Sequence, residues 1–98
     1  MIYYLDMHFD WDTNKAASNE RKHGISFNEA MTVFDDGDAL YIPDETGIEY
    51  EERFNILGMS NESNLLMVCH CYRDNDAVIR IISARSATKT EQNLYGGA

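Results

Sequence analysis

Three consecutive residues with metal-binding and redox-active side chains, Cys69, His70 and Cys71, lie in the apolar run LLMVCHCYR. Thiolate and imidazole are ligands that zinc and other transition metals prefer, so a metal site has to be considered for these three residues. The run reads as a β-strand, however, in which neighbouring side chains point to opposite faces. We therefore expect His70 to point away from both thiols and predict no metal site. Cysteines two apart on a strand have Cα atoms about 6.5–7 Å apart, the limit for a disulfide, so two free thiols in a reducing cytosol are expected.

A second group of side chains could take part in binding or catalysis. It comprises Arg21, Lys22 and His23, which directly precede Gly24 in the stretch NERKHGISFNEA. The polar stretch between Asp12 and Gly24 is compatible with a helix that Asp12 caps. Gly24 predicts the end of this helix, because glycine adopts the left-handed conformation there at low cost. In the last turn, unpaired carbonyls favour cations by about 0.3–1 kcal/mol. The three cations are therefore explained by a helix end, which leaves a second role in binding open.

The distribution of charge along the chain determines which functions the net charge can exclude. The chain has 98 residues, which predicts a single domain over residues 1–98, and its formal net charge is −9. That charge argues against a generic polyanion-binding protein. Residues 35–52, however, hold eight acidic and no basic side chains, whereas residues 53–98 hold five basic and four acidic ones. Because the excess is local, it does not exclude RNA as a substrate.

The hydropathy of the chain indicates the expected location of the protein in the cell. No apolar run approaches the roughly 18–20 residues that a membrane span requires. The N-terminal stretch MIYYLDMHFDW has neither the basic region nor the long apolar region of a secretory signal. We therefore expect a cytoplasmic protein without a membrane partner.

The elements that position these residues follow from periodicity and turn signals. A short strand at 8–11 precedes the first helix, and Ser26 with Glu29 predicts a capping box at the start of a second helix, 26–34. Further strands are predicted at 39–42, 53–59, 65–73 and 77–84, and a closing helix at 87–95. The prediction is an α+β fold, with an antiparallel sheet of four or five strands, and with two N-terminal helices and one C-terminal helix packed against it. Residues 1–7 are interpreted as an N-terminal extension and residues 96–98 as a tail.

A longer pattern covers roughly residues 8–95. Its first part comprises Trp11, Asp12, Lys15, Asn19, Lys22, His23, Gly24, Ile25, Phe27, Glu29 and Ala30. Its second part comprises Glu52, Arg53, Gly58 and the run RIISARSAT from Arg80 to Thr88. Taken together, this pattern resembles the BrnT toxins of bacterial type II toxin–antitoxin systems.

The resemblance implies a RelE-like fold and a ribonuclease that arrests translation. It also implies a BrnA-like antitoxin that neutralises the toxin and binds DNA, so that operator DNA is reached only through the antitoxin. No cofactor is implied, and a homodimer is left open.

Two features depart from the family pattern. The segment GIEYEE before Arg53 has no histidine where the family commonly has one, and the helix after Glu91 lacks the family's additional basic residues.

Metal-independent cleavage of RNA needs a base for the 2′-hydroxyl, cations for the charge on the phosphorane, and an acid for the leaving oxygen. Arginine suits the second task, since its planar fork binds two phosphate oxygens. Histidine can exchange a proton near neutral pH, and tyrosine can stack on a base or donate a proton. The predicted catalytic residues are Arg53, His70, Tyr72, Arg80 and Arg85. The residues predicted to bind RNA or the antitoxin are Lys22, His23, Arg73 and Lys89.

Strand alternation limits this catalytic set. His70 and Tyr72 share one face of their strand, and Arg73 lies on the other. In the next strand, Arg80 and Arg85 have opposite parity. The set can therefore occupy one face only where a bulge or a strand end intervenes. Each residue also has a structural interpretation: a half-buried histidine, a packed tyrosine, and arginines paired with carboxylates.

Two other functions remain open at this point. The same fold without nuclease activity would serve as an antitoxin-binding or corepressor subunit, which the small number of basic residues favours. A small-molecule enzyme that uses the Cys-His-Cys strand is the third hypothesis. The intact run from Arg80 to Arg85 favours the ribonuclease.

Overall fold

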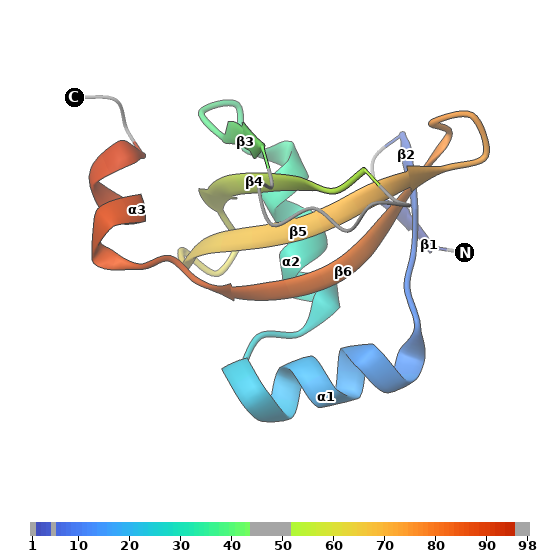
Figure 1. Ribbon diagram of the computed structural model, residues 1–98, viewed down its shortest axis with the longest axis horizontal. Helices are drawn as coiled ribbons and strands as arrows, with labels where there is room; N and C mark the ends of the chain where they lie inside the picture. Colours follow the sequence, from blue (N-terminus) through green and yellow to red (C-terminus); the bar gives the residue numbers. More distant parts are fainter. Residues whose placement is uncertain (1, 5, 44–51, 96–98) are drawn as a thin grey trace.

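The computed structural model describes residues 2–4, 6–43 and 52–95 (Figure 1). The strands are β1 Ile2–Tyr4, β2 Met7–Asp10, β3 Leu40–Pro43, β4 Phe54–Met59, β5 Leu65–Arg73 and β6 Val78–Ser86. The helices are α1 Thr13–His23, α2 Phe27–Met31, the 3-10 helix η1 Thr32–Asp35, and α3 Lys89–Leu94. No helix in these residues has the length and apolar character needed to cross a membrane. The predicted tail, residues 96–98, lies outside the described residues.

The strands form one six-stranded sheet in the order β1-β2-β6-β5-β4-β3. The α+β class is as predicted, but an antiparallel sheet of four or five strands was wrong in two respects. β1 lies inside the predicted N-terminal extension and pairs with β2; its three residues are too few to give a strand pattern. β2 runs parallel to β6, whereas the other neighbouring pairs are antiparallel. Alternation within a strand does not reveal its neighbour, so the parallel pair had no signal in the sequence.

One face of the sheet carries the hydrophobic core. α1 and α2 pack against β6, and η1 packs against β4. We call this side the helix face; its buried strand residues are Phe9, Ile56, Leu66, Val68, Ile81 and Ala84. Phe27 and Ala30 of α2 are buried in the same cluster. Burying one large apolar side chain contributes about 1.5–3 kcal/mol, so this cluster is the main stabilising feature of the fold.

The ends of α1 are formed as the sequence predicted. The Asp12 side chain accepts hydrogen bonds from the backbone N–H groups of Asn14 and Lys15, at 2.8 and 3.0 Å. Gly24 has φ +72° and donates its N–H to the Glu20 carbonyl at 2.8 Å. Both caps depend on neighbouring residues alone, which is why the sequence could predict them.

Only half of the predicted capping box forms at α2. The Ser26 hydroxyl accepts a hydrogen bond from the Glu29 N–H at 3.1 Å, but the Glu29 side chain does not return to Ser26. Glu29 Oε2 instead accepts hydrogen bonds from Ser60 Oγ at 2.6 Å and Asn64 Nδ2 at 2.8 Å. The buried carboxylate therefore fixes the turn between β4 and β5 to α2, a distant contact that local spacing cannot predict.

Asn19 joins α1 to the sheet. Its side chain is buried and donates from Nδ2 to the carbonyls of Ile25 and Ala84, at 3.0 and 2.9 Å. Its Oδ1 accepts a hydrogen bond from the Ala84 N–H at 3.1 Å. One amide thus satisfies three backbone groups and fixes α1, and the loop after it, to β6.

Gly58 in β4 allows η1 to approach the sheet closely. A Cβ atom at this position would lie 2.8 Å from Val33 Cγ1 and 3.0 Å from Ala39 Cβ. Such contacts are too short for carbon atoms, so any larger side chain would push η1 away from the sheet. This packing constraint accounts for a glycine at position 58.

α3 differs from the predicted helix that packs against the sheet. None of its residues is buried, and it lies beyond the end of β6 (Figure 1). Polar contacts hold it: the Tyr95 hydroxyl donates to Asp36 Oδ2 at 2.6 Å, and Ala87 N–H donates to the Leu65 carbonyl at 2.9 Å. The bond to Asp36 raises the pKa of Tyr95 to about 12. The prediction was wrong here because this segment has too few apolar residues to form a packed face.

Candidate functional site

A β-bulge in β6 decides which side chains share a face of the sheet. Cys69 pairs with Ser83, but the next residue of β5, His70, pairs with Ile81, so Ile82 has no partner in β5. This extra residue reverses the alternation of side chains on its two sides. By regular alternation, Arg80 and Arg85 would lie on opposite faces of the sheet. A bulge such as this one is one of the two irregularities, with a strand end, that would let them share a face.

The bulge places Arg80 and Arg85 on the same face. Arg80 lies opposite Cys71 and Arg85 lies opposite Met67, two positions of β5 with the same parity as Arg73. All of them face away from the hydrophobic core of the helix face. We call this side the arginine face. The two pairings are four residue steps apart along β5, which correspond to about 14 Å, so Arg80 and Arg85 lie at two positions along one surface.

Strand β2 contributes to the arginine face as well. Phe9 is completely buried in the core, so its neighbours His8 and Asp10 point to the arginine face. Asp10 pairs with Arg80 in the parallel ladder, and its Oδ1 accepts a hydrogen bond from Arg80 Nη1 at 3.1 Å. The two side chains are 35% and 31% exposed. Such partly exposed pairs contribute little stability, and the Arg80 guanidinium has further N–H donors beside the one that Asp10 accepts.

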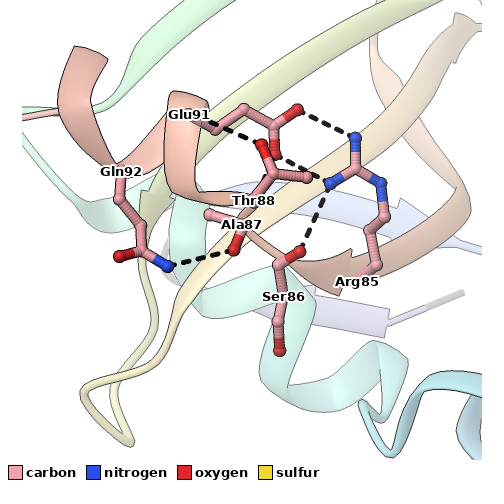
Figure 2. Close-up of polar contacts among 6 residues, drawn as sticks. All are labelled: Arg85, Ser86, Ala87, Thr88, Glu91 and Gln92. Carbon is pink, nitrogen blue, oxygen red and sulfur yellow. Dashed lines mark hydrogen bonds and ion pairs between the residues drawn. The ribbon is translucent and has the colours of Figure 1, made fainter.

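Arg85 is held more firmly (Figure 2). Its Nη1 and Nη2 donate to Oε1 and Oε2 of Glu91 at 2.8 and 2.9 Å, and Nη1 also donates to the Ser86 carbonyl at 3.3 Å. This bidentate pair lowers the pKa of Glu91 to about 2 and raises the pKa of Arg85. Glu91 Oε1 also accepts the Thr88 N–H, and Thr88 Oγ1 accepts the Glu91 N–H, which makes a capping box for α3. Arg85 is therefore fixed to the start of α3.

Arg53 directly precedes β4. Because Asn55 pairs with Cys69, extending the alternation by two residues places Arg53 on the arginine face, next to Cys71. The Arg53 Nε atom is buried and has no hydrogen-bond partner. A buried donor left unsatisfied costs about 1–3 kcal/mol, so an anion that accepts this N–H would remove the penalty.

His70 and Tyr72 lie on the helix face, away from the arginines. His70 is completely buried, and its ring contacts Phe34 edge-on at 4.8 Å between centroids. Its Nδ1 lies 3.3 Å from the Val68 carbonyl oxygen, and its Nε2 lies 3.4 Å from the Tyr72 hydroxyl. Burial lowers the pKa of His70 to about 4, so the ring is neutral at pH 7. A neutral ring beside a carbonyl donates from Nδ1 and leaves Nε2 to accept from Tyr72.

Two further aromatic rings enclose this histidine. Tyr41 of β3 and Phe54 of β4 have ring centroids 6.3 and 6.1 Å from that of His70. Burial is also the largest cause that raises the pKa of Tyr72. The structure therefore divides the predicted catalytic set: Arg53, Arg80 and Arg85 lie on the arginine face, and His70 and Tyr72 lie in an aromatic cluster on the helix face.

The residues predicted to bind RNA or antitoxin are also divided. Lys22 and His23 are exposed in the last turn of α1, on the helix side of the sheet. Arg73 is exposed at the end of β5, on the arginine face, and Lys89 is exposed at the start of α3. The predicted strand alternation holds at the Cys-His-Cys stretch, because Cys69 and Cys71, which form no disulfide, point away from the His70 side.

A hollow of about 170 Å³ lies elsewhere, where η1 meets the turn after β4. It is lined by Tyr4, Thr32, Asp35, Asp36, Met59, Ser60 and Asn61. Two of these residues are acidic and none is basic. The lining therefore offers a phosphate two carboxylates and no cation, and the hollow is separate from the arginine face.

The fold and this site define a class: a small α+β domain that presents several arginines on the face of its sheet opposite the helices. A profile described as "Ribonuclease toxin, BrnT, of type II toxin-antitoxin system" matches residues 11–91. The chain therefore belongs to the BrnT family of ribonuclease toxins of type II toxin–antitoxin systems.

A solved structure supports the fold. The crystal structure of the Brucella abortus ribonuclease toxin BrnT, at 1.1 Å resolution, superposes with a TM-score of 0.65. It has 24% sequence identity, and the match covers 85% of this chain and 99% of the Brucella chain. A search of curated proteins gave no match. The solved neighbour thus agrees with the family assignment at the level of the fold.

Two residues of the arginine face had no role in the sequence analysis. His8 and Asp10 lie in a weakly alternating strand, and their proximity to Arg80 depends on the parallel pairing of β2 with β6. The alternation around Phe9 was the only signal available, and it could not identify the neighbouring strand.

Proposed function

We propose that the chain is a RelE-like ribonuclease that cleaves RNA without a metal ion and thereby arrests translation in the cytoplasm. The observation that carries the proposal is the bulge in β6, which puts Arg80 and Arg85 on one face with Arg73. Family membership supplies the class of reaction. In this proposal the arginine face binds the scissile phosphate and its neighbours along the RNA strand.

The arginines supply positive charge where negative charge develops. A phosphorane gains charge on its equatorial oxygens, and guanidinium groups stabilise it through charge-assisted hydrogen bonds. A phosphate accepts the donors of Arg80 that Asp10 leaves unused, and it satisfies the buried Nε of Arg53. In this proposal His70 and Tyr72 support the sheet from the helix face, since a buried, neutral imidazole has no access to an RNA strand on the other side.

The antitoxin is the second partner in the proposal. A BrnA-like protein neutralises the toxin and links it to operator DNA. Lys22 and His23 are exposed on the helix side, where an acidic segment of the antitoxin has access to them without competing with RNA. Arg73 and Lys89 are assigned to the RNA strand.

The test is expression of the chain alone in bacteria, beside Arg80→Ala and Arg85→Ala. The unaltered chain arrests growth and cleaves RNA in the presence of EDTA. Arg80→Ala lowers the cleavage rate about 100-fold or more, because it removes charge stabilisation from the transition state, and Arg85→Ala lowers the rate because it weakens binding of the RNA strand. Arg21→Ala is the matched control, since Arg21 is an exposed arginine on α1, away from the arginine face. Equal loss in the control, or inhibition of the unaltered chain by EDTA, contradicts the proposal.

A second candidate function is a non-catalytic subunit that only binds the antitoxin. The specific observation in its favour is that Arg80 and Arg85 are each already paired with a carboxylate, in a chain of net charge −9. For this candidate, expression of the chain alone is harmless, no RNA is cleaved, and the antitoxin is still bound tightly. The same experiment therefore separates the two functions.

A further inference from the structure

The three histidines of the chain occupy three different environments. His70 is buried on the helix face, and His23 is exposed at the end of α1. His8 lies in the middle of β2, half-buried, and points to the arginine face. His8 is therefore the histidine that shares a surface with Arg80 and Arg85.

The register of the sheet places His8 close to Arg80. His8 pairs with Val78 and Asp10 pairs with Arg80, so His8 and Arg80 are diagonal neighbours on the same face. Diagonal neighbours in a sheet have Cα atoms about 7–8 Å apart, within the reach of an arginine side chain. The Tyr3 ring, from β1, contacts the His8 ring edge-on at 4.3 Å between centroids and limits its rotation. A partly exposed imidazole is thus held beside a guanidinium that binds phosphate in the proposed function.

We propose that His8 is the general base of the RNA cleavage, a role that rests on the proposed function. Its imidazole accepts the proton of the 2′-hydroxyl, the 2′-oxygen forms a bond to phosphorus, and the P–O5′ bond breaks. The products are a 2′,3′-cyclic phosphate and a 5′-hydroxyl; water protonates the leaving 5′-oxygen, and His8 returns its proton to solvent. Arg80 stabilises the phosphorane between these two bond changes.

Charged and titratable groups from several elements surround His8. The charged or titratable groups that face it or border it are Tyr3 of β1, Asp10 of β2, Arg80 of β6, Arg73 of β5 beyond Val78, and Asp74 and Asp76 in the turn before β6. Asp10 is engaged by Arg80, so on β2 the imidazole of His8, rather than the carboxylate of Asp10, is available to accept a proton. A base acts only when deprotonated, so the rate rises with pH until the imidazole is neutral.

The test compares His8→Gln with the unaltered chain on a short RNA, with Met7→Leu as the matched control. Met7 is the neighbour of His8 on β2 and packs toward the core, so a volume-conserving change there leaves the arginine face intact. His8→Gln lowers kcat about 100-fold or more with little change in KM, and it removes the rising limb of the pH–rate profile. Imidazole added to His8→Ala restores part of the rate, which a purely structural role for His8 would not allow.

A second measurement does not depend on whether the variants fold. An RNA analogue with 2′-deoxy substitution at the cleavage position binds without reacting, and in the unaltered chain it shifts the NMR signals of the His8 ring. Cleavage by His8→Gln with an unchanged rate and pH profile, or His8 signals that do not move, overturns the role of His8 while the ribonuclease stands. Absence of cleavage by the unaltered chain overturns both proposals.

Discussion

His70 illustrates how one side chain couples the fold to pH. Its imidazole is neutral because burial lowers its pKa from 6.5 to about 4, although its contact with the Val68 carbonyl opposes the shift. In the unfolded chain the ring binds a proton near pH 6.5. The unfolded state therefore binds more protons between these values, and the stabilisation present above pH 6.5 is lost as the pH falls toward 4.

The lowered pKa of His70 predicts an acid-sensitive core. Between pH 7 and pH 4 the free energy of unfolding should fall about 2–3 kcal/mol more in the unaltered chain than in His70→Gln, which cannot titrate. Denaturant unfolding at several pH values measures both. Comparing the two chains cancels the carboxylates that titrate in the same range, including Glu91. Parallel pH profiles for the two chains would show that His70 is not held neutral by burial.

At the scale of elements, the sequence predicted what neighbouring residues determine. The caps at Asp12 and Gly24, the helix between them, and the alternation of β5 all depend on contacts within a few residues. The sequence also showed that Arg80 and Arg85 needed a bulge to share a face, but not where it lies. β1, the parallel β2–β6 pair and the contacts of Glu29 depend on residues far apart in the chain, so no local pattern contained them.

The residues of the candidate site also divide into those that the sequence could identify and those that it could not. The sequence identified Arg53, Arg80 and Arg85 by residue type and family pattern, and the sheet places all three on one side. It grouped His70 with them because the strand's inner and outer faces cannot be distinguished without the helices that cover one of them. It gave His8 no role, because only the pairing of β2 with β6 brings His8 near Arg80.

Asn19 connects two elements, and its loss should separate them. Asn19→Ala leaves the Ala84 N–H and two carbonyls without partners in a buried position, which predicts a loss of about 2–4 kcal/mol in unfolding free energy. Hydrogen exchange should show that α1 loses more protection than β5. Asn14→Ala, an exposed asparagine on the same helix, is the control and should change stability by less than about 0.5 kcal/mol. Equal effects of the two substitutions would contradict the role given to Asn19.

For the whole molecule, the local distribution of charge has more influence than the total. Eight acidic side chains with no base belong to residues 35–52, whereas the arginine face assembles cations from the start of β4 and from β5 and β6. Exposed charges farther apart than about 8–10 Å are largely screened at physiological salt. RNA bound at the arginine face therefore experiences mainly the guanidinium groups there and the carboxylates paired with them, Asp10 and Glu91.

The cations assigned to the RNA strand predict the salt dependence of RNA binding. If these five cations neutralise five phosphates of a single strand, the slope of log K against log salt is about −3.5, because each contact contributes about −0.7. The five are Arg53, Arg73, Arg80, Arg85 and Lys89. Affinity for a 2′-deoxy RNA analogue should then fall about 100-fold between 50 and 200 mM salt. Arg80→Gln should reduce the slope by about one fifth, whereas Arg21→Gln, on α1, should leave it unchanged. Binding titrations at four salt concentrations measure the slope, and a slope near zero would mean that no phosphate contacts these arginines.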